Sequence, residues 1–143
     1  MQTVAQILKS KPSQAVCSIA PTALVLDAIR LLAEKGIGAL LVMEGEQVVG
    51  IVTERDYVRK VDLWGRSSTD TRVSAIMTSS VMYVGPDESN EQCMVLMTEN
   101  RLRHLPVMDD GKLIGLISIG DLVKGTISEQ QFLIQQLEHY IRG

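Results

Sequence analysis

Aromatic side chains are scarce in this 143-residue sequence, which has one tryptophan, three tyrosines and one phenylalanine. Apolar residues nevertheless make up 45% of the chain, so any core must be aliphatic, built from Val, Ile, Leu, Met and Ala. That apolar content excludes intrinsic disorder and low complexity. The length suits one ordinary domain, or two half-domains that share one core.

Cysteine motifs, basic charge and long apolar runs are also missing. The two cysteines, Cys17 and Cys93, have no CxxC spacing. The net charge is −3 and the pI is about 5.4, so no basic field attracts nucleic acid or anionic membranes. The longest apolar run, near residues 37–43, is too short to cross a bilayer, and no signal-like segment opens the chain. We therefore expect a cytoplasmic protein with reduced thiols that binds neither nucleic acid nor membrane.

What the sequence does contain is a repeat. Residues 50–56 read Gly-Ile-Val-Thr-Glu-Arg-Asp, and residues 115–121, 65 positions later, read Gly-Leu-Ile-Ser-Ile-Gly-Asp. Each copy has a glycine, a hydroxyl residue three places on and an aspartate three places after that. Self-similarity at this spacing indicates two like structural units. We expect the two units to bury their apolar hairpin faces against each other about a pseudo-twofold axis.

Each unit is predicted to contain a helical turn, a strand, a helix, the two strands of a hairpin and a short helix. In the first unit these elements are residues 4–8, 16–19, 22–35, 39–43, 48–53 and 54–61, with Thr22 and Thr53 as helix caps and Gly36 as a left-handed C-terminal cap. In the second unit they are residues 73–77, 81–84, a helix capped by Asp87, and residues 105–108, 113–118 and 119–124. The predicted boundaries are repeat one at 1–62, a linker at 63–72, repeat two at 73–126 and a separate C-terminal helix at 127–143.

That C-terminal helix is predicted from a capping-box pattern at Ser128 and from an amphipathic stripe. The stripe consists of Leu133, Leu137, Tyr140 and Ile141. Because the helix lies outside the repeat, we favour a contact between its stripe and a second subunit over packing on the body of the protein.

The hydroxyl residue and the aspartate of each motif stand where a strand gives way to a helix. Such a junction presents unpaired backbone N–H groups and the positive end of the helix dipole, which suit a phosphate, and Thr53 or Ser118 can add a hydroxyl donor. Asp56 or Asp121, one turn later, can accept hydrogen bonds from a ribose diol. The pattern therefore suits a nucleotide lying along the junction. It is also the pattern of a routine helix N-terminus, so simple capping remains the alternative.

Signals of catalysis and of metal binding are not found. The sequence has no Gly-rich phosphate loop, no Cys/His or Ser/His/Asp grouping and no acidic cluster for magnesium. Nothing has the His, Cys or carboxylate spacing of a metal site. We therefore expect a protein that is not an enzyme and holds no metal.

The repeated motif is accompanied by two further segments, Ser-Ala-Ile-Met-Thr at residues 74–78 and Arg-His-Leu-Pro-Val at residues 103–107. Together these segments resemble the CBS-domain family in its tandem form, the Bateman module, over about residues 1–126. The resemblance implies an α+β fold of two pseudo-twofold-related β-α-β-β-α repeats, to which the C-terminal helix is added. It also implies two clefts that bind adenosine-containing ligands such as AMP, ADP, ATP, S-adenosylmethionine or NAD.

The same resemblance assigns roles by position. It implies that Asp56 and Asp121 bind ribose hydroxyls, while Thr53 and Ser118 help to hold phosphate or ribose. The adenine would lie between the segment after residue 78 and the first strand of a hairpin, where the implied contacts are Ser79, Val81, His104 and Pro106, with Ala39 as the first-unit counterpart.

The two copies differ in ways that predict unequal sites. Arg55 has Gly120 as its counterpart, and Leu41 stands where the second unit has Pro106. We therefore expect the site of Ser118 and Asp121 to be the better one. Positive charge at Arg55 and Arg103 favours AMP as the ligand, with NAD(H) as the second choice.

The expected function is that of a non-catalytic sensor. A nucleotide would change the geometry of the repeats or of a homodimer, and a separate regulated protein, not identified by the sequence, would respond to that geometry. The alternative is a purely structural adaptor that binds no ligand and in which both motifs only cap helices.

Overall fold

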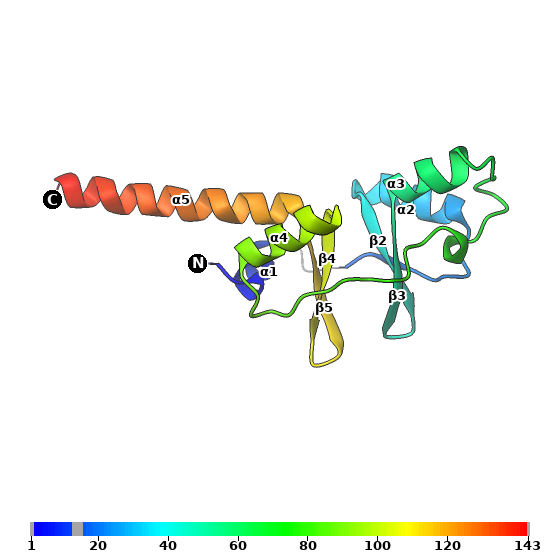
Figure 1. The fold of residues 1–143 in the computed structure, drawn as a ribbon, viewed down its shortest axis with the longest axis horizontal. Coiled ribbons are helices and arrows are strands. Elements are labelled where there is room, and N and C mark those ends of the chain that lie inside the picture. The colour runs from blue at the N-terminus through cyan, green and yellow to red at the C-terminus, as the bar shows by residue number, and fades with distance from the viewer. Residues whose placement is uncertain (1, 13–15, 143) are drawn as a thin grey trace. The chain divides into compact units, whose positions relative to one another are not determined.

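The computed structural model describes residues 2–12 and 16–142 (Figure 1). The chain forms two compact units. The central unit consists of residues Val16–Val81, and the terminal unit combines Met1–Ala15 with Met82–Gly143. Each unit has its own hydrophobic core.

The central unit is a three-stranded sheet with helices. Its elements are β1 (Ser18–Ile19), α2 (Val25–Lys35), β2 (Ala39–Glu44), β3 (Gln47–Thr53), α3 (Glu54–Tyr57), a π-helical turn (Val58–Asp62) and a 3-10 turn (Val73–Ala75). Strand β2 pairs in parallel with β1 and antiparallel with β3. The predicted first hairpin is therefore confirmed, and the helix expected over 54–61 is divided into α3 and the π-helical turn.

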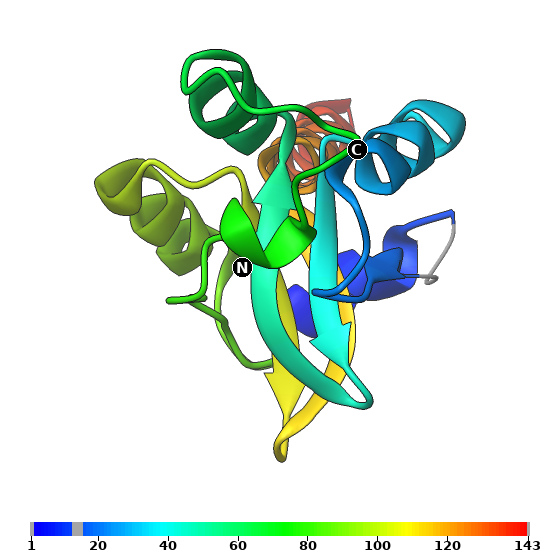
Figure 2. The same cartoon turned by 90° about the vertical axis from the view of Figure 1, so that its right-hand side faces the viewer.

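Residues 71–78 complete the central unit, although the sequence repeat assigns most of them to the second copy. Ile51 and Thr78 exchange backbone hydrogen bonds of 3.0 and 2.9 Å, and Val73 N–H donates to Ala23 O at 2.8 Å. The 3-10 turn in this segment lies across one face of the β2–β3 hairpin (Figure 2). The sequence repeats and the compact units are thus different divisions of the chain.

The terminal unit is built around the second hairpin. Its elements are α1 (Val4–Ser10), α4 (Asn90–Asn100), β4 (His104–Asp109), β5 (Lys112–Ser118) and α5 (Ile119–Arg142). Helix α1 belongs here because Val4 N–H donates to Glu88 O at 2.8 Å and Ala5 N–H to Pro86 O at 2.9 Å. The opening segment of the first sequence repeat therefore packs with the second, as the opening segment of the second packs with the first.

The strand expected over 81–84 is reduced to a single parallel bridge between Val84 and Val107. In the central unit, Leu41 N–H donates to Cys17 O at 3.2 Å and so extends the equivalent parallel ladder. The residue in that position of β4 is Pro106, which has no N–H to donate toward Met82. The missing donor accounts for the missing strand.

Of the helix caps predicted within the two repeats, those at Thr22 and Asp87 are wrong, and those at Thr53 and Gly36 are confirmed. Helix α2 begins after Leu24 without a side-chain cap, so Thr22 is not its cap, because Val25 N–H donates to Thr71 O and Leu26 N–H to Ser68 O. Ser89, not Asp87, caps α4 by accepting from Gln92 N–H at 3.1 Å. The cap at Thr53 and the left-handed C-terminal cap at Gly36 are confirmed.

Helix α5 is one continuous helix of 24 residues, where two helices separated near residue 126 were expected. Ser128 therefore lies within the helix and does not begin it. Gly125 does not interrupt α5 but lets it approach Gln2 and the start of α4, since a Cβ there would lie 2.4 Å from Gln2 Oε1 and 3.1 Å from Asn90 Nδ2. Close packing, not a break, explains this glycine.

The core of each unit is aliphatic, as the composition predicts. The central unit buries Val25, Ala28, Leu32, Leu40, Val42, Val52, Val61, Val73 and Ile76. The terminal unit buries Val4, Ile7, Leu8, Val84, Cys93, Met97, Leu105, Val107, Ile117 and Leu122. Among the described helices, none combines the length and apolar character needed to span a membrane.

Candidate functional site

The first copy of the motif lies at the junction of β3 and α3. Thr53 Oγ1 accepts from Asp56 N–H at 3.3 Å, and Asp56 Oδ2 accepts from Thr53 N–H at 2.9 Å and from Thr53 Oγ1 at 3.2 Å. Lys60, one turn later, contacts the other carboxylate oxygen, with 3.2 Å between Nζ and Oδ1. Asp56 is 9% exposed. Both of its oxygens are therefore engaged within the unit.

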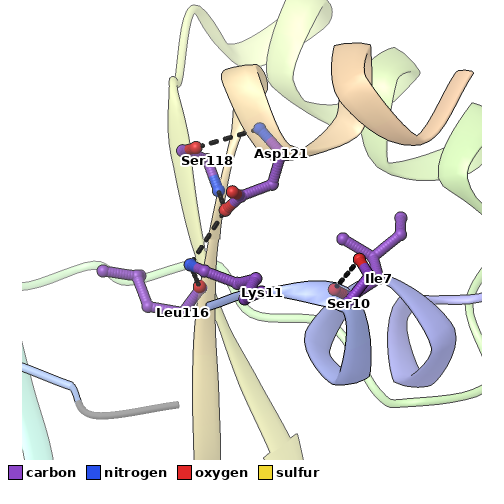
Figure 3. Close-up of polar contacts among 6 residues, drawn as sticks. All are labelled: Ile7, Ser10, Lys11, Leu116, Ser118 and Asp121. Atoms are coloured by element: carbon purple, nitrogen blue, oxygen red, sulfur yellow. Dashed lines mark hydrogen bonds and ion pairs between the residues drawn. The ribbon is translucent and has the colours of Figure 1, made fainter. Parts of the chain in front are cut away.

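The second copy lies at the junction of β5 and α5 and uses the same cap. Asp121 Oδ2 accepts from Ser118 N–H at 2.8 Å, and Ser118 Oγ accepts from Asp121 N–H at 3.1 Å. Lys11, which follows α1, donates from Nζ to the same Oδ2 at 2.9 Å and to Leu116 O at 2.8 Å (Figure 3). No described residue donates a hydrogen bond to Oδ1 of Asp121.

The environment of Asp121 keeps its carboxylate ionised. Burial alone raises the pKa of Asp121, but hydrogen bonds from Ser118 and Lys11 and the charge of Lys11 outweigh it, so that the pKa is lowered below its ordinary value of 3.8. At neutral pH the second motif therefore presents a negative, hydrogen-bond-accepting oxygen.

The two lysines are residues that the sequence reasoning missed. In each copy the ammonium contacts the motif aspartate and also donates to a backbone carbonyl, Ile76 O for Lys60 at 2.9 Å and Leu116 O for Lys11. Lys60 has a sequence signal, because it stands four residues after Asp56 on a helix. Lys11 has none, because it lies 110 residues from Asp121 in sequence.

The helix N-termini offer fewer free N–H groups than the sequence predicts. Glu54 N–H donates to Gly38 O at 3.3 Å and Ile119 N–H donates to Arg103 O at 2.9 Å. The third N–H of each helix is taken by the hydroxyl of Thr53 or Ser118. Two of the first three N–H groups in each helix are therefore already bonded within the chain.

The motif glycines serve the packing of the opening segments. A Cβ on Gly50 would lie 2.6 Å from Met77 Sδ and 3.1 Å from Thr78 O, and one on Gly115 would lie 2.7 Å from Leu8 Cδ2. Met77 and Leu8 occupy equivalent places in the two opening segments. Each glycine therefore makes room for the segment that completes its unit.

The other predicted contact residues divide between the units. Ala39 pairs with Thr53 in the central unit, and His104 pairs with Ser118 in the terminal unit, so each hairpin brings its predicted adenine contact beside its own motif. Pro106 is buried on β4, whereas Arg103 is exposed.

The remaining predicted contacts, Ser79 and Val81, follow the 3-10 turn in the central unit. Arg55 is an exposed residue of the same unit. The adenine site expected from these residues together with His104 and Pro106 stays a prediction.

Both cysteines lie in the part of the chain that the structure describes. Burial, with the charge of Glu88 adding to it, raises the pKa of Cys93 to about 11, so this thiol is protonated and unreactive. Cys17 and Cys93 are both free. Across residues 2–12 and 16–142, no three His, Cys, Asp or Glu side chains gather in a way that could hold a metal ion.

Comparison with known proteins decides the family, because the CBS domain model matches residues 4–62 and again residues 73–127. The chain belongs to the CBS-domain family. It is 40% identical to the CBS domain-containing protein CBSX3, mitochondrial, of Arabidopsis thaliana, over 99% of this chain and 72% of that protein. The predicted α+β fold class with two CBS repeats is confirmed.

Solved structures agree with this assignment. A protein with CBS domains from Burkholderia ambifaria is 61% identical, with a TM-score of 0.88 over 90% of this chain and 96% of that one. The CBS domain pair of protein MJ0100, solved in complex with 5′-methylthioadenosine and S-adenosyl-L-methionine, has a TM-score of 0.76 over 90% of this chain and 98% of that one. At 21% identity this second similarity shows the fold alone.

Proposed function

We propose that this CBS protein is a non-catalytic regulatory module that binds an adenosine-containing ligand, with AMP favoured, at the motif of Ser118 and Asp121. The observation that carries the proposal is the second carboxylate oxygen of Asp121. Lys11 and Ser118 hold Oδ2 and keep the group ionised, while Oδ1 receives no hydrogen bond from a described residue. A ribose diol supplies the two hydroxyl donors that such an oxygen can accept.

Charge and position support a nucleotide over a bare nucleoside. Arg103 is exposed, and its carbonyl accepts from the first N–H of α5, so its backbone is fixed beside the motif. A guanidinium at this place can bind a phosphate in a charge-assisted contact. The ligands bound by the MJ0100 domain pair support the adenosine class for this chain, and NAD(H) remains the second choice.

Regulation of another protein is the second part of the proposal. Ligand binding would alter the geometry of the repeats or of a homodimer, and a separate regulated protein would respond to it. The absence of catalysis is part of this proposal. It is tested by incubating the purified protein with ATP or NADH, where product formation would contradict it.

A thermal-shift panel of AMP, ADP, ATP, NAD, NADH and S-adenosylmethionine tests the binding. A ligand at one hundred times its Kd should stabilise the wild type by about 2.7 kcal/mol. Asp121→Asn should lose this stabilisation, because the amide can still accept from Ser118 N–H but has no second acceptor for a ribose hydroxyl. If no compound raises the melting temperature of the wild type, the binding proposal fails.

A purely structural adaptor is the second candidate, and one observation favours it. In the first motif the hydroxyl and the carboxylate form a complete capping box, and the second motif makes the equivalent pair of backbone bonds. Capping by itself therefore explains the residues without a ligand. The adaptor predicts a melting temperature that none of the six compounds changes.

A further inference from the structure

The C-terminal part of α5 presents an apolar surface that nothing in the described chain covers. Only Leu122 and Gly125 of this helix are buried, and every residue from 130 to 142 is exposed. Exposed fractions reach 53% for Ile134, 62% for Leu137 and 81% for Ile141. In Figure 1 the first turns of α5 run beside α4, and the later orange and red turns extend beyond it. A contiguous apolar surface of this kind marks an interaction site.

Six exposed residues of α5 follow a coiled-coil spacing. Steps of four, three, four, three and four residues connect the positions that we call the seam: Val123, Ile127, Gln130, Ile134, Leu137 and Ile141. All six are exposed. This alternation places them along one stripe of the helix, which is the pattern by which helices pair.

The seam and the body of the terminal unit use different faces of α5. Leu122 is fully buried and its carbonyl accepts from Asn90 Nδ2 at 3.0 Å, while Gly125 packs against Gln2 and Asn90. The neighbouring seam residues Val123 and Ile127 are nevertheless 45% and 48% exposed. The seam therefore remains accessible along its whole length.

We propose that α5 pairs antiparallel with α5 of a second copy of this chain along the seam. With a twofold axis at residue 132, every seam residue meets a seam residue of the second copy. The pairs are Val123 with Ile141, Ile127 with Leu137, and Gln130 with Ile134, each formed twice. The overlap of about 20 residues corresponds to about 30 Å of helix.

Charge complementarity selects the second copy and the antiparallel direction. In this arrangement Lys124 and Glu138 of the second copy, which each follow a seam residue by one position, lie on the same flank of the interface and within two residues of the same level, and the symmetry forms this pair twice. Flanking charges of opposite sign set the partner and the orientation of paired helices. In the parallel arrangement Glu138 faces Leu133 instead, and Lys124 has no acidic residue opposite it. The favoured occupant of the seam is therefore an identical α5 in the reverse direction.

Sedimentation of the full chain at low ionic strength tests the pairing. The wild type should sediment as a dimer, and Ile134→Asp/Leu137→Asp should be monomeric at the same concentration. The matched control, Gln135→Asp/Gln136→Asp, places two aspartates on the same turns beside the seam and should stay dimeric. Since all four side chains are exposed, circular dichroism should show the same fold in each. A monomeric wild type, or an Ile134→Asp/Leu137→Asp variant that sediments as a dimer, overturns the proposal.

A charge exchange tests the predicted contact. Glu138→Lys alone should raise the dimer dissociation constant about tenfold, because it forms two like-charged pairs. Adding Lys124→Glu should restore the wild-type constant. If the double variant dissociates as readily as Glu138→Lys, the Lys124–Glu138 contact is absent and the proposed register is wrong.

Disulfide trapping tests the direction, in a Cys17→Ser background with Cys93 buried. A mixture of an Ile127→Cys chain and a Leu137→Cys chain, one of them carrying a mass tag, is oxidised. The antiparallel pairing predicts a mixed disulfide between the two chains, whereas a parallel pairing predicts disulfides between like chains. A product made only of like chains overturns the antiparallel assignment.

Discussion

The two copies of the motif have the same cap but differ in their lysines. Asp56 is contacted on Oδ1 by Lys60 of the same helical segment, so both of its oxygens are occupied. Asp121 is contacted on Oδ2 by Lys11, which comes from the other end of the chain. A repeated motif therefore fixes the position of a carboxylate, while a lysine outside the motif differs between the copies in which carboxylate oxygen it contacts.

The hairpins show a second difference between the halves. Leu41 N–H extends a parallel ladder in the central unit, and Pro106 cannot do so in the terminal unit. The strand before the helix is consequently present in one unit and reduced to one bridge in the other. One substitution between the copies thus changes secondary structure, whereas the remainder of each hairpin keeps the same register.

The largest effect on stability is expected when the residues at positions 41 and 106 are exchanged between the two hairpins. Leu41→Pro should lower the free energy of unfolding by roughly 3 to 5 kcal/mol, because it leaves Cys17 O without its donor and creates a cavity at a fully buried side chain. Pro106→Leu, the reverse exchange, should change stability by no more than about 1 kcal/mol. Urea unfolding of both variants measures the contrast, and equal losses would show that the ladder does not distinguish the units.

The next effect concerns the ligand. At one hundred times Kd, Asp121→Asn should remove most of the stabilisation of about 2.7 kcal/mol, and Asp56→Asn should retain most of it. The reason is that Lys60 contacts Oδ1 of Asp56 and Thr53 donates to Oδ2, so Asp56 has less accepting capacity for a ribose hydroxyl than Asp121. Thermal shifts of the two variants with the same compound give the comparison. A larger loss in Asp56→Asn would place the better site in the first copy.

Alanine substitutions at the two motif glycines should differ less in their cost to stability. Gly50→Ala should cost about 2 kcal/mol, because its Cβ meets Met77 Sδ and also the carbonyl of Thr78, which is fixed in a backbone pair with Ile51. Gly115→Ala should cost about 1 kcal/mol, because the three atoms nearest to its Cβ all belong to the side chain of Leu8, which can rotate. Chemical denaturation ranks the two, and a costlier Gly115→Ala would contradict the steric argument.

Local and periodic features could be predicted from the sequence, and long-range ones could not. The hairpins and the cap at Thr53 follow from apolar runs and nearby residues, which act over a few positions. The cap at Thr22 was wrong because carbonyls of Ser68 and Thr71 already accept from the first turn of α2. Those acceptors are more than 40 residues away, and no local pattern reveals them.

The candidate site shows the same limit. The motif residues themselves were found from their repeat, but Lys11 reaches Asp121 only because α1 folds into the terminal unit. Continuity of α5 was missed for a related reason, since a glycine usually weakens a helix. At Gly125 the tertiary contact with Gln2 and Asn90 requires the absence of a side chain. Tertiary packing therefore explains a glycine at position 125 that local helix propensity disfavours.

The smallest effect is a pH dependence that isolates the Lys11–Asp121 pair. Because the folded-state pKa of Asp121 is lowered, its contribution to stability is fully present above its ordinary pKa of 3.8 and is lost as the pH falls through the lowered value. Asp121→Asn should therefore be less stable than the wild type at pH 7 by about 1 kcal/mol. The difference should persist to about pH 5 and shrink below about pH 4.

Lys11→Met is the matched variant for this measurement. It removes the hydrogen bond and the charge that lower the pKa of Asp121 while Ser118 still caps α5, so the pH-dependent part of the difference should become smaller. Free energies of unfolding at pH 7, 5, 4 and 3 for the three proteins decide the matter. If the wild type and Asp121→Asn lose stability in parallel over this whole range, Asp121 is not held ionised by Lys11, and the contrast with Asp56 must have another origin.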